Sequence, residues 1–138
     1  LEDLSRTLLI LADLAIFPIS PSVLDVRSVV TATEVLRYAQ SIRQGMPKGK
    51  IVLNKMRARG RISNQLRLAV PTLGLEVAKS VVRNLDAFCD APQQGTVVSR
   101  LGSKAAQPAA ELDELFMEIL GDYLVVEEST TRRKISNG

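Results

Sequence analysis

Apolar residues along the chain follow two patterns, helical spacing and short unbroken runs. Leu4, Leu8 and Leu11 recur at intervals of three to four residues, which predicts an amphipathic helix over residues 2–11. The next apolar stretch, residues 14–20, contains no polar residue before its last position. An unbroken run of this length is typical of a strand that is covered on both faces in a parallel sheet.

The same two patterns continue to residue 120. Ser22, followed three residues later by Asp25, resembles a helix-capping pair, and the helix that it opens is expected to reach Arg43. The further expected elements are a buried strand at 50–54, a helix opened by Ser63 that ends near 71–74, a more exposed edge strand at 75–82, a short helix at 86–91 and a helix at 104–120. After Gly121 the periodicity is lost, and we expect residues 122–138 to form a flexible tail.

Strands that alternate with helices along a chain predict the α/β class, here a three-layer fold with a parallel sheet and right-handed crossover helices. The length of 138 residues is that of one domain. Sheets of this kind bind ligands beyond the carboxyl ends of their strands. This rule directs attention to residues 18–25, 54–61 and 83–86.

The composition removes several classes of site. The chain has no histidine and one cysteine, which excludes the common zinc sites and the Ser–His and Cys–His catalytic pairs. We therefore predict no catalytic residue and no metal site. Cys89 follows Phe88 in an apolar context and is expected to be a reduced thiol in the core. A lone cysteine fits a reducing cytoplasm, and no apolar run is long enough to cross a membrane.

One segment of the chain is strongly basic. The net charge is only +3, but Arg57, Arg59, Arg61 and Arg67 all fall within residues 48–70, which contain no acidic residue. We expect the first three arginines to lie in a loop and Arg67 to lie on the following helix. Guanidinium groups suit phosphates, so the four arginines are predicted to contact the backbone of nonspecific DNA. The alternative is a solvated surface loop, which runs of charge usually are.

Asn54 stands at the end of the second expected strand. Its amide offers one donor and one acceptor to the edge of a base, and adenine suits this pairing. GTP-binding proteins use a related Asn-Lys, followed two residues after the Lys by an Asp that accepts from guanine. Arg57 occupies that place here and cannot accept, so guanine selectivity is not expected. The alternative is that Asn54 only caps the turn after its strand.

Four segments, taken in order, resemble a known family. They resemble the carboxyl-terminal half of ParA-type partition ATPases, the deviant P-loop superfamily that also includes MinD-like proteins. The matching segments are ADLAIFPISPSVLDV, IVLNKM, LDAFCDAPQQGTVV and SKAAQPAAELDELFMEIL. The resemblance spans most of residues 4–120 and implies a P-loop NTPase-like fold. Residues 1–121 are then the carboxyl-terminal part of a ParA-like ATPase domain, and residues 122–138 are its tail.

The resemblance also implies roles for single residues. Asn54 matches the adenine-contacting Asn of the family. Arg83 and Asn84 match the loop that closes over the base, although the Pro that relatives often carry there is absent. Pro18 matches the proline at the end of the preceding strand. Leu85 stands where relatives commonly carry an Arg, and Arg83 is expected to substitute for it.

The phosphate-binding machinery of the family has no match here. No Gly- and Lys-rich turn opens a helix, and no Asp-rich strand end is present to hold magnesium. The chain starts with Leu1 rather than Met, so we expect a partial domain that lacks the amino-terminal P-loop half. The intact family uses ATP and ADP with magnesium. The chain alone is expected to bind neither nucleotide tightly and to be inactive as an ATPase.

The function that the resemblance implies is a part in plasmid or chromosome partitioning by a ParA-like ATPase. The expected partners are nonspecific DNA, a second copy of the chain in a homodimer, and a ParB-like protein that stimulates hydrolysis. The expected location is the bacterial cytoplasm, at the nucleoid and not at a membrane. One alternative is a noncatalytic DNA-binding or protein-interaction module that keeps the fold. The other is a MinD-like membrane-associated ATPase, whose terminal amphipathic anchor residues 122–138 match poorly.

Overall fold

The computed structural model describes the backbone of residues 2–135 and the side chains of residues 4–121 and 123. Within this part of the chain, three parallel strands form one sheet in the order β1-β2-β3. The strands are β1 (Leu14–Ile19), β2 (Lys48–Met56) and β3 (Glu76–Arg83). The α-helices are α1 (Glu2–Leu11), α2 (Val23–Ile42), α3 (Arg61–Ala69), α4 (Ala87–Gln93) and α5 (Ala106–Ile135). The 3-10 helices are η1 (Val70–Leu73), η2 (Val98–Arg100) and η3 (Ser103–Ala105).

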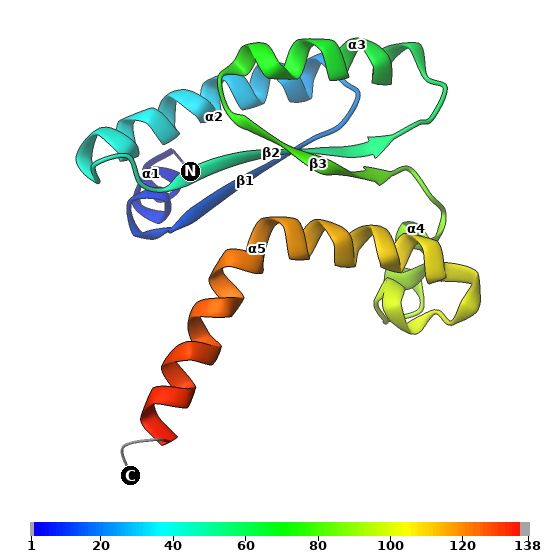
Figure 1. Ribbon diagram of the computed structural model, residues 1–138. Helices are drawn as coiled ribbons and strands as arrows, with labels where there is room; N and C mark the ends of the chain where they lie inside the picture. The colour runs from blue at the N-terminus through cyan, green and yellow to red at the C-terminus, as the bar shows by residue number, and fades with distance from the viewer. Residues whose placement is uncertain (1, 136–138) are drawn as a thin grey trace.

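The helices cover the two faces of the sheet in separate layers. Figure 1 shows α2 and α3 over one face and the first part of α5 across the other face. The α2/α3 side is filled by one apolar cluster: Ile19, Val29, Ile51, Leu53, Met56, Leu66 and Val70. The α5 side is filled by another: Val52, Ala78, Val82, Leu115 and Ile119. The predicted three-layer α/β class is confirmed, and the arrangement is consistent with part of a P-loop NTPase-like fold.

The start of α2 is fixed by two polar side chains. Ser22 Oγ accepts a hydrogen bond from the Leu24 backbone N–H at 3.2 Å, as expected of a residue at the N-cap position. Asp25 reaches back further than in a capping box, because its Oδ2 accepts from the Ser20 N–H at 3.1 Å. These two bonds hold the corner between β1 and α2, which is where β1 presents its carboxyl end.

Gly49 brings α2 unusually close to the sheet. A Cβ built at Gly49 would lie well inside van der Waals distance of Leu36 Cδ2, and 3.3 Å from Leu75 Cδ2. The Leu36 side chain is fully buried. Glycine at position 49 therefore leaves the space that the Leu36 side chain of α2 occupies.

The pairing of β3 with β2 is irregular in the middle of the strand. Ile51 pairs with Val77 but Leu53 pairs with Val81, so β3 uses more residues than β2 over the same span. Within that span Glu118 of α5 accepts from two backbone N–H groups, those of Lys79 at 2.7 Å and Ser80 at 2.8 Å. The carboxylate supplies acceptors to two consecutive N–H groups in this irregular span, and it attaches α5 to the sheet.

The predicted edge position of the third strand is confirmed, but other expectations are wrong at particular residues. The α5-side face of β1 is poorly covered: Ile16 is 44% exposed and Pro18 is also exposed, because α5 packs on β3 rather than on β1. The last helix does not end at Gly121 but continues to Ile135, and Figure 1 shows its second half running away from the sheet. The flexibility of the tail stays a prediction, as does the boundary at residue 121. Residues 136–138 lie outside the described part of the chain.

Candidate functional site

The carboxyl ends of the three strands meet at one edge of the sheet, and two hollows open there. One hollow, of about 490 Å³, lies on the α5 side of the sheet and is called the α5-face hollow. The other, of about 530 Å³, lies between the ends of β1 and β2 and the start of α3, and is called the basic cavity. Lys55 and Asn84 line both. The molecular surface is therefore concave at the position where a parallel sheet is expected to bind a ligand.

The α5-face hollow gathers the four residues that the resemblance assigns to the base. Pro18, Asn54, Arg83 and Asn84 all line it, from the ends of three different strands. The remaining wall is largely apolar, with Val52, Phe88 and Leu115 among its members. An apolar hollow with a few polar groups at one end suits a flat aromatic ligand whose edge needs hydrogen bonds. The role of these residues in nucleotide binding stays a prediction.

Asn54 is in the middle of its sheet but is not the last residue of its strand. β2 continues for two residues to Met56, although Lys55 has a left-handed backbone with φ of 51°. Asn54 Oδ1 accepts from the Lys55 N–H at 2.9 Å, which is the local cap that the alternative interpretation expects. An amide oxygen has two lone pairs and the amide nitrogen has two hydrogens. The cap therefore leaves Asn54 with donors and an acceptor for a ligand.

Arg83 is held by α5 rather than left open to the hollow. Its guanidinium forms an ion pair with Glu111, and both Nε and a terminal nitrogen approach Glu111 Oε1. The backbone N–H of Arg83 donates to Glu111 Oε2 at 3.3 Å. A cation that is already paired with a carboxylate attracts a further anion weakly. Arg83 is placed beside the base position, but its charge is largely compensated.

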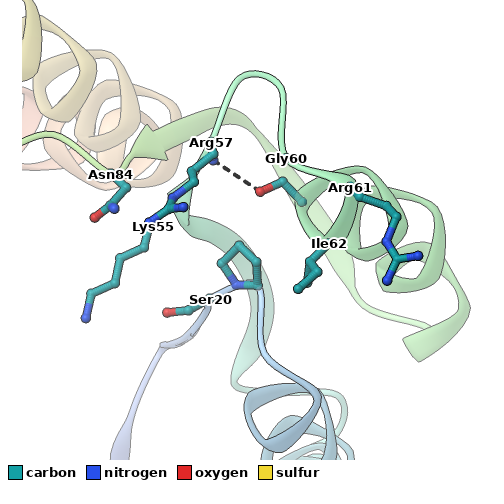
Figure 2. Close-up of a pocket in the computed structure, with 9 residues that line it drawn as sticks. Ser20, Lys55, Arg57, Gly60, Arg61, Ile62 and Asn84 are labelled. Carbon is teal, nitrogen blue, oxygen red and sulfur yellow. Dashed lines mark hydrogen bonds between the residues drawn. The ribbon is translucent and has the colours of Figure 1, made fainter.

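The basic cavity is lined by three cationic side chains, those of Lys55, Arg57 and Arg61. In Figure 2 the Lys55 side chain runs beside Ser20 and away from Gly60, and Arg61 lies on the other side of Ile62 with its guanidinium pointing away from Lys55. Within the described part of the chain none of the three forms an ion pair, unlike Arg43 with Asp13, Lys50 with Glu76 and Arg83 with Glu111. The positive charge of the cavity is therefore uncompensated.

Ser63 contributes to the wall of this cavity, but it is not the helix-opening residue that the sequence predicts. It does not open the helix, since α3 begins at Arg61 with Gly60 at the N-cap position. Ser63 is buried, and its Oγ accepts from the Arg57 N–H at 3.1 Å, which closes the loop against the first turn of α3. The prediction that Arg61 lies in the loop is wrong for the same reason. In sequence Ser63 resembles an N-cap residue. In the structure it is buried inside the first turn of α3, and its hydroxyl accepts a hydrogen bond from the loop backbone.

The structure places the four predicted DNA-contacting arginines in different surroundings. Arg57 and Arg61 line the basic cavity, Arg59 is exposed in the loop, and Arg67 lies in the last turn of α3. All four belong to the same loop and helix, and each has an exposed side chain. Lys55 was missed by sequence reasoning, because its place in the cavity depends on a left-handed backbone that local sequence does not indicate.

Cys89 is exposed and lines the α5-face hollow, so the expectation of a buried core thiol is wrong. The apolar neighbours Ala87 and Phe88 face inward from α4, while Cys89 falls on the open side of that helix. Among the described residues, no three Cys, Asp or Glu side chains are grouped so that they could hold a metal ion. Of the described helices, none combines the length and the apolar character needed to cross a membrane.

Comparison with known proteins finds a distant relative. The chain is 27% identical over 115 residues to "Maintenance of carboxysome distribution protein A" from Halothiobacillus neapolitanus (strain ATCC 23641 / c2). The match covers 82% of this chain and 52% of that protein, so the chain spans about half the length of the curated relative. No family model matches the sequence. The match loosely supports a relation to ParA- and MinD-like proteins.

Proposed function

We propose that this chain is part of a ParA-like ATPase that positions a cargo in the cell, such as a plasmid or a chromosome. In this proposal the α5-face hollow forms the adenine-side wall of the nucleotide site, and the loop and helix that carry Arg57, Arg59, Arg61 and Arg67 bind nonspecific DNA. The similarity to a protein named for carboxysome distribution supports a positioning role. The nucleotide would be ATP or ADP with magnesium. The phosphate-binding residues would come from outside the 138 residues, so the chain alone would not hydrolyse ATP.

The observation that carries this proposal is the meeting of Pro18, Asn54, Arg83 and Asn84 around one hollow. These residues come from three separate parts of the sequence, at or just after the ends of three different strands. The apolar wall beside them supplies the stacking surface that a purine needs, and the amides supply edge contacts. A shared hollow at the carboxyl edge of a parallel sheet is the position in which such folds bind nucleotides.

Adenosine is expected to bind weakly in the α5-face hollow, and guanosine is not. In a heteronuclear NMR titration of the chain, adenosine should shift the Asn54 side-chain amide and the Asn84 backbone amide. Asn54→Ala, which removes the side-chain amide itself, should abolish the shift of the Asn84 backbone amide, because both edge contacts are lost. Asn64→Ala, at an exposed position on α3, is the matched control and should leave them intact. Equal shifts with guanosine, or shifts confined to another surface, would remove the assignment.

The DNA part of the proposal is supported by charge and exposure. The loop and helix that carry Arg57, Arg59, Arg61 and Arg67 contain no carboxylate between residues 48 and 70. Contacts from such arginines to phosphates release counterions, and the affinity then falls steeply with salt. The affinity should be the same for duplexes of unrelated sequence, since phosphate contacts do not read bases.

The triple variant Arg57→Ala/Arg59→Ala/Arg61→Ala is expected to flatten the salt dependence of DNA binding. Each lost phosphate contact should reduce the slope of log K against log salt by about 0.9, so the total reduction is up to ~2.7. The measurement is fluorescence anisotropy with a labelled duplex at several salt concentrations. Arg27→Ala/Arg37→Ala/Lys104→Ala removes the same charge from exposed positions elsewhere and is the control. An unchanged slope in the triple variant Arg57→Ala/Arg59→Ala/Arg61→Ala would refute DNA contact by these three arginines.

Homodimerisation, a ParB-like partner and a nucleoid location in the bacterial cytoplasm belong to the same proposal. A second candidate is a noncatalytic DNA-binding or interaction module that keeps the fold. The pairing of Arg83 with Glu111 and the local cap made by Asn54 favour this candidate, because both reduce what the hollow offers to a base. DNA binding without any response to adenosine would select it.

A further inference from the structure

We propose that the basic cavity is a discrete binding site for one phosphoryl group, which Lys55 and Arg57 hold in front of the first turn of α3. This inference rests in part on the proposed DNA surface, because Arg57 and Arg61 belong to both. It differs in assigning a defined pocket and a new residue, Lys55, in place of a diffuse patch of four arginines.

The concave shape of the cavity allows contacts to an anion from more than one side. It is a hollow of about 530 Å³, open to solvent, between the Ser20–Pro21 corner, the Lys55–Arg57 turn and the start of α3. Figure 2 shows these segments arranged around a common space, with the Lys55 side chain on one side and Ile62 on the other. A concave site offers a phosphoryl group donors from several directions, which an exposed loop does not.

The electrostatics of the cavity favour an anion. No carboxylate lines it among the described residues, and its three cationic side chains form no ion pair there. Asp25 is close by in the fold, but it lies outside the lining and its Oδ2 accepts from the Ser20 N–H. Like charges gathered in a hollow repel one another, and a bound anion relieves that repulsion.

The backbone adds further donors. α3 is nine residues long, and Gly60 at its N-cap position has no side chain with which to satisfy the N–H groups of the first turn. That turn carries no acidic residue either. The Arg57 N–H is already used by Ser63 Oγ, which fixes the turn against the helix. The free N–H groups of the first turn therefore border the same space as Lys55 and Arg57, and they complement an oxyanion.

Lys55 is held in an unfavourable backbone conformation in this place. Its φ of 51° lies in the left-handed region, which a residue other than Gly, Asn or Asp seldom adopts. The Asn54 side chain stabilises the turn by accepting from the Lys55 N–H. Asn or Gly at position 55 would fit this backbone better than Lys. The presence of lysine is explained if its ammonium group is used in the cavity.

The test is an amide NMR titration of the 138-residue chain with inorganic phosphate, compared with chloride at equal ionic strength. Phosphate is expected to shift the amides of residues 60–63 in a saturable way. Lys55→Asn should weaken this binding about 10-fold, as the loss of a charge-assisted hydrogen bond does. Lys48→Asn, at the exposed opposite end of β2, makes the same charge change and should leave phosphate binding unchanged. Both variants should remain folded, because Asn accepts the backbone at position 55; Lys55→Gly should behave as Lys55→Asn does.

Two sources of the phosphoryl group are separated by adding a short DNA duplex to the phosphate-bound chain. Displacement of phosphate from residues 60–63 identifies the DNA backbone as the source. Phosphate that stays bound while the duplex binds elsewhere identifies a free phosphate ester. The proposal is overturned if phosphate acts no differently from chloride, or if Lys48→Asn weakens binding as much as Lys55→Asn. If the triple arginine variant shows an unchanged salt dependence of DNA binding, the DNA proposal fails while the phosphate titration still stands as a separate test of this site.

Discussion

Leu36→Ala is expected to lower the free energy of unfolding by about 2–5 kcal/mol, the usual range for a buried leucine whose removal leaves a cavity. Leu36 is fully buried between α2 and the sheet, directly over Gly49. Gly49→Ala is expected to cost about 1–3 kcal/mol for the opposite reason, because its new methyl group overlaps the Leu36 side chain. Equilibrium unfolding in urea, followed by far-ultraviolet circular dichroism, measures both changes.

The double variant Leu36→Ala/Gly49→Ala distinguishes this packing argument from a general weakness of the region. In the double variant the new methyl group at position 49 enters space that the leucine side chain has left, so it no longer overlaps a neighbour. The double variant should therefore be more stable than the sum of the two single effects predicts, by a coupling of about 0.5–3 kcal/mol. Strict additivity of the two substitutions would contradict the close approach of α2 to β2.

Glu118→Ala is expected to destabilise the protein by about 1–3 kcal/mol at neutral pH, because two β3 N–H groups lose a charged acceptor. The matched control is Glu114→Ala, one turn earlier on α5, whose side chain is exposed. Its effect should stay within about 0.5 kcal/mol. Thermal or urea unfolding of the two variants beside the parent chain measures the difference, and equal losses would refute the attachment of α5 through Glu118.

The same carboxylate predicts a pH dependence. Burial tends to raise the pKa of Glu118, but the hydrogen bonds from Ser80 and Lys79, aided by the Lys50 ammonium, outweigh it and hold the pKa below its usual range. A group whose pKa is depressed on folding contributes stability that is fully present above its unfolded pKa. That contribution is lost as the pH falls through the lower, folded pKa.

Glu118→Gln removes this titration while keeping the size of the side chain. The stability gap between the parent chain and Glu118→Gln should be largest at neutral pH and should close as the pH falls below 4.5. Urea unfolding at several pH values between neutral and acidic conditions gives the gap. A gap that is constant across this range would show that the carboxylate charge does not stabilise the folded state.

The elements of the fold were predictable because their signals are local. Unbroken apolar runs predicted β1 and β2, an apolar segment interrupted by polar residues predicted β3 as an edge strand, and helical spacing predicted α1 and α2 to within a residue or two. Their alternation was enough to predict a parallel sheet and hence the edge at which ligands bind. Asn54 and the arginine segment drew attention for the same reason, since an amide or a charge at a strand end is visible in sequence.

Other features depend on how the loops and helices pack in three dimensions. Ser63 has the sequence of a helix cap, yet it is the loop backbone at Arg57 that uses its hydroxyl. Cys89 has apolar neighbours, yet the direction of α4 exposes it. The pairing of Arg83 with Glu111 joins residues 28 positions apart, and it changes how Arg83 can serve a ligand. None of these could be assigned before the helices were placed on the sheet.

The sequence by itself determined the α/β class, the order of strands and helices, and the end of the sheet that carries the polar and basic residues. These follow from the spacing of apolar side chains, which depends only on the periods of helix and strand. Only the tertiary structure decided that these residues divide between two hollows, that Lys55 joins the cationic group, and that Glu118 fastens α5 to an irregular β3. Those outcomes depend on the backbone angle of Lys55, on the β2–β3 register and on where α3 and α5 pack, which local patterns do not encode.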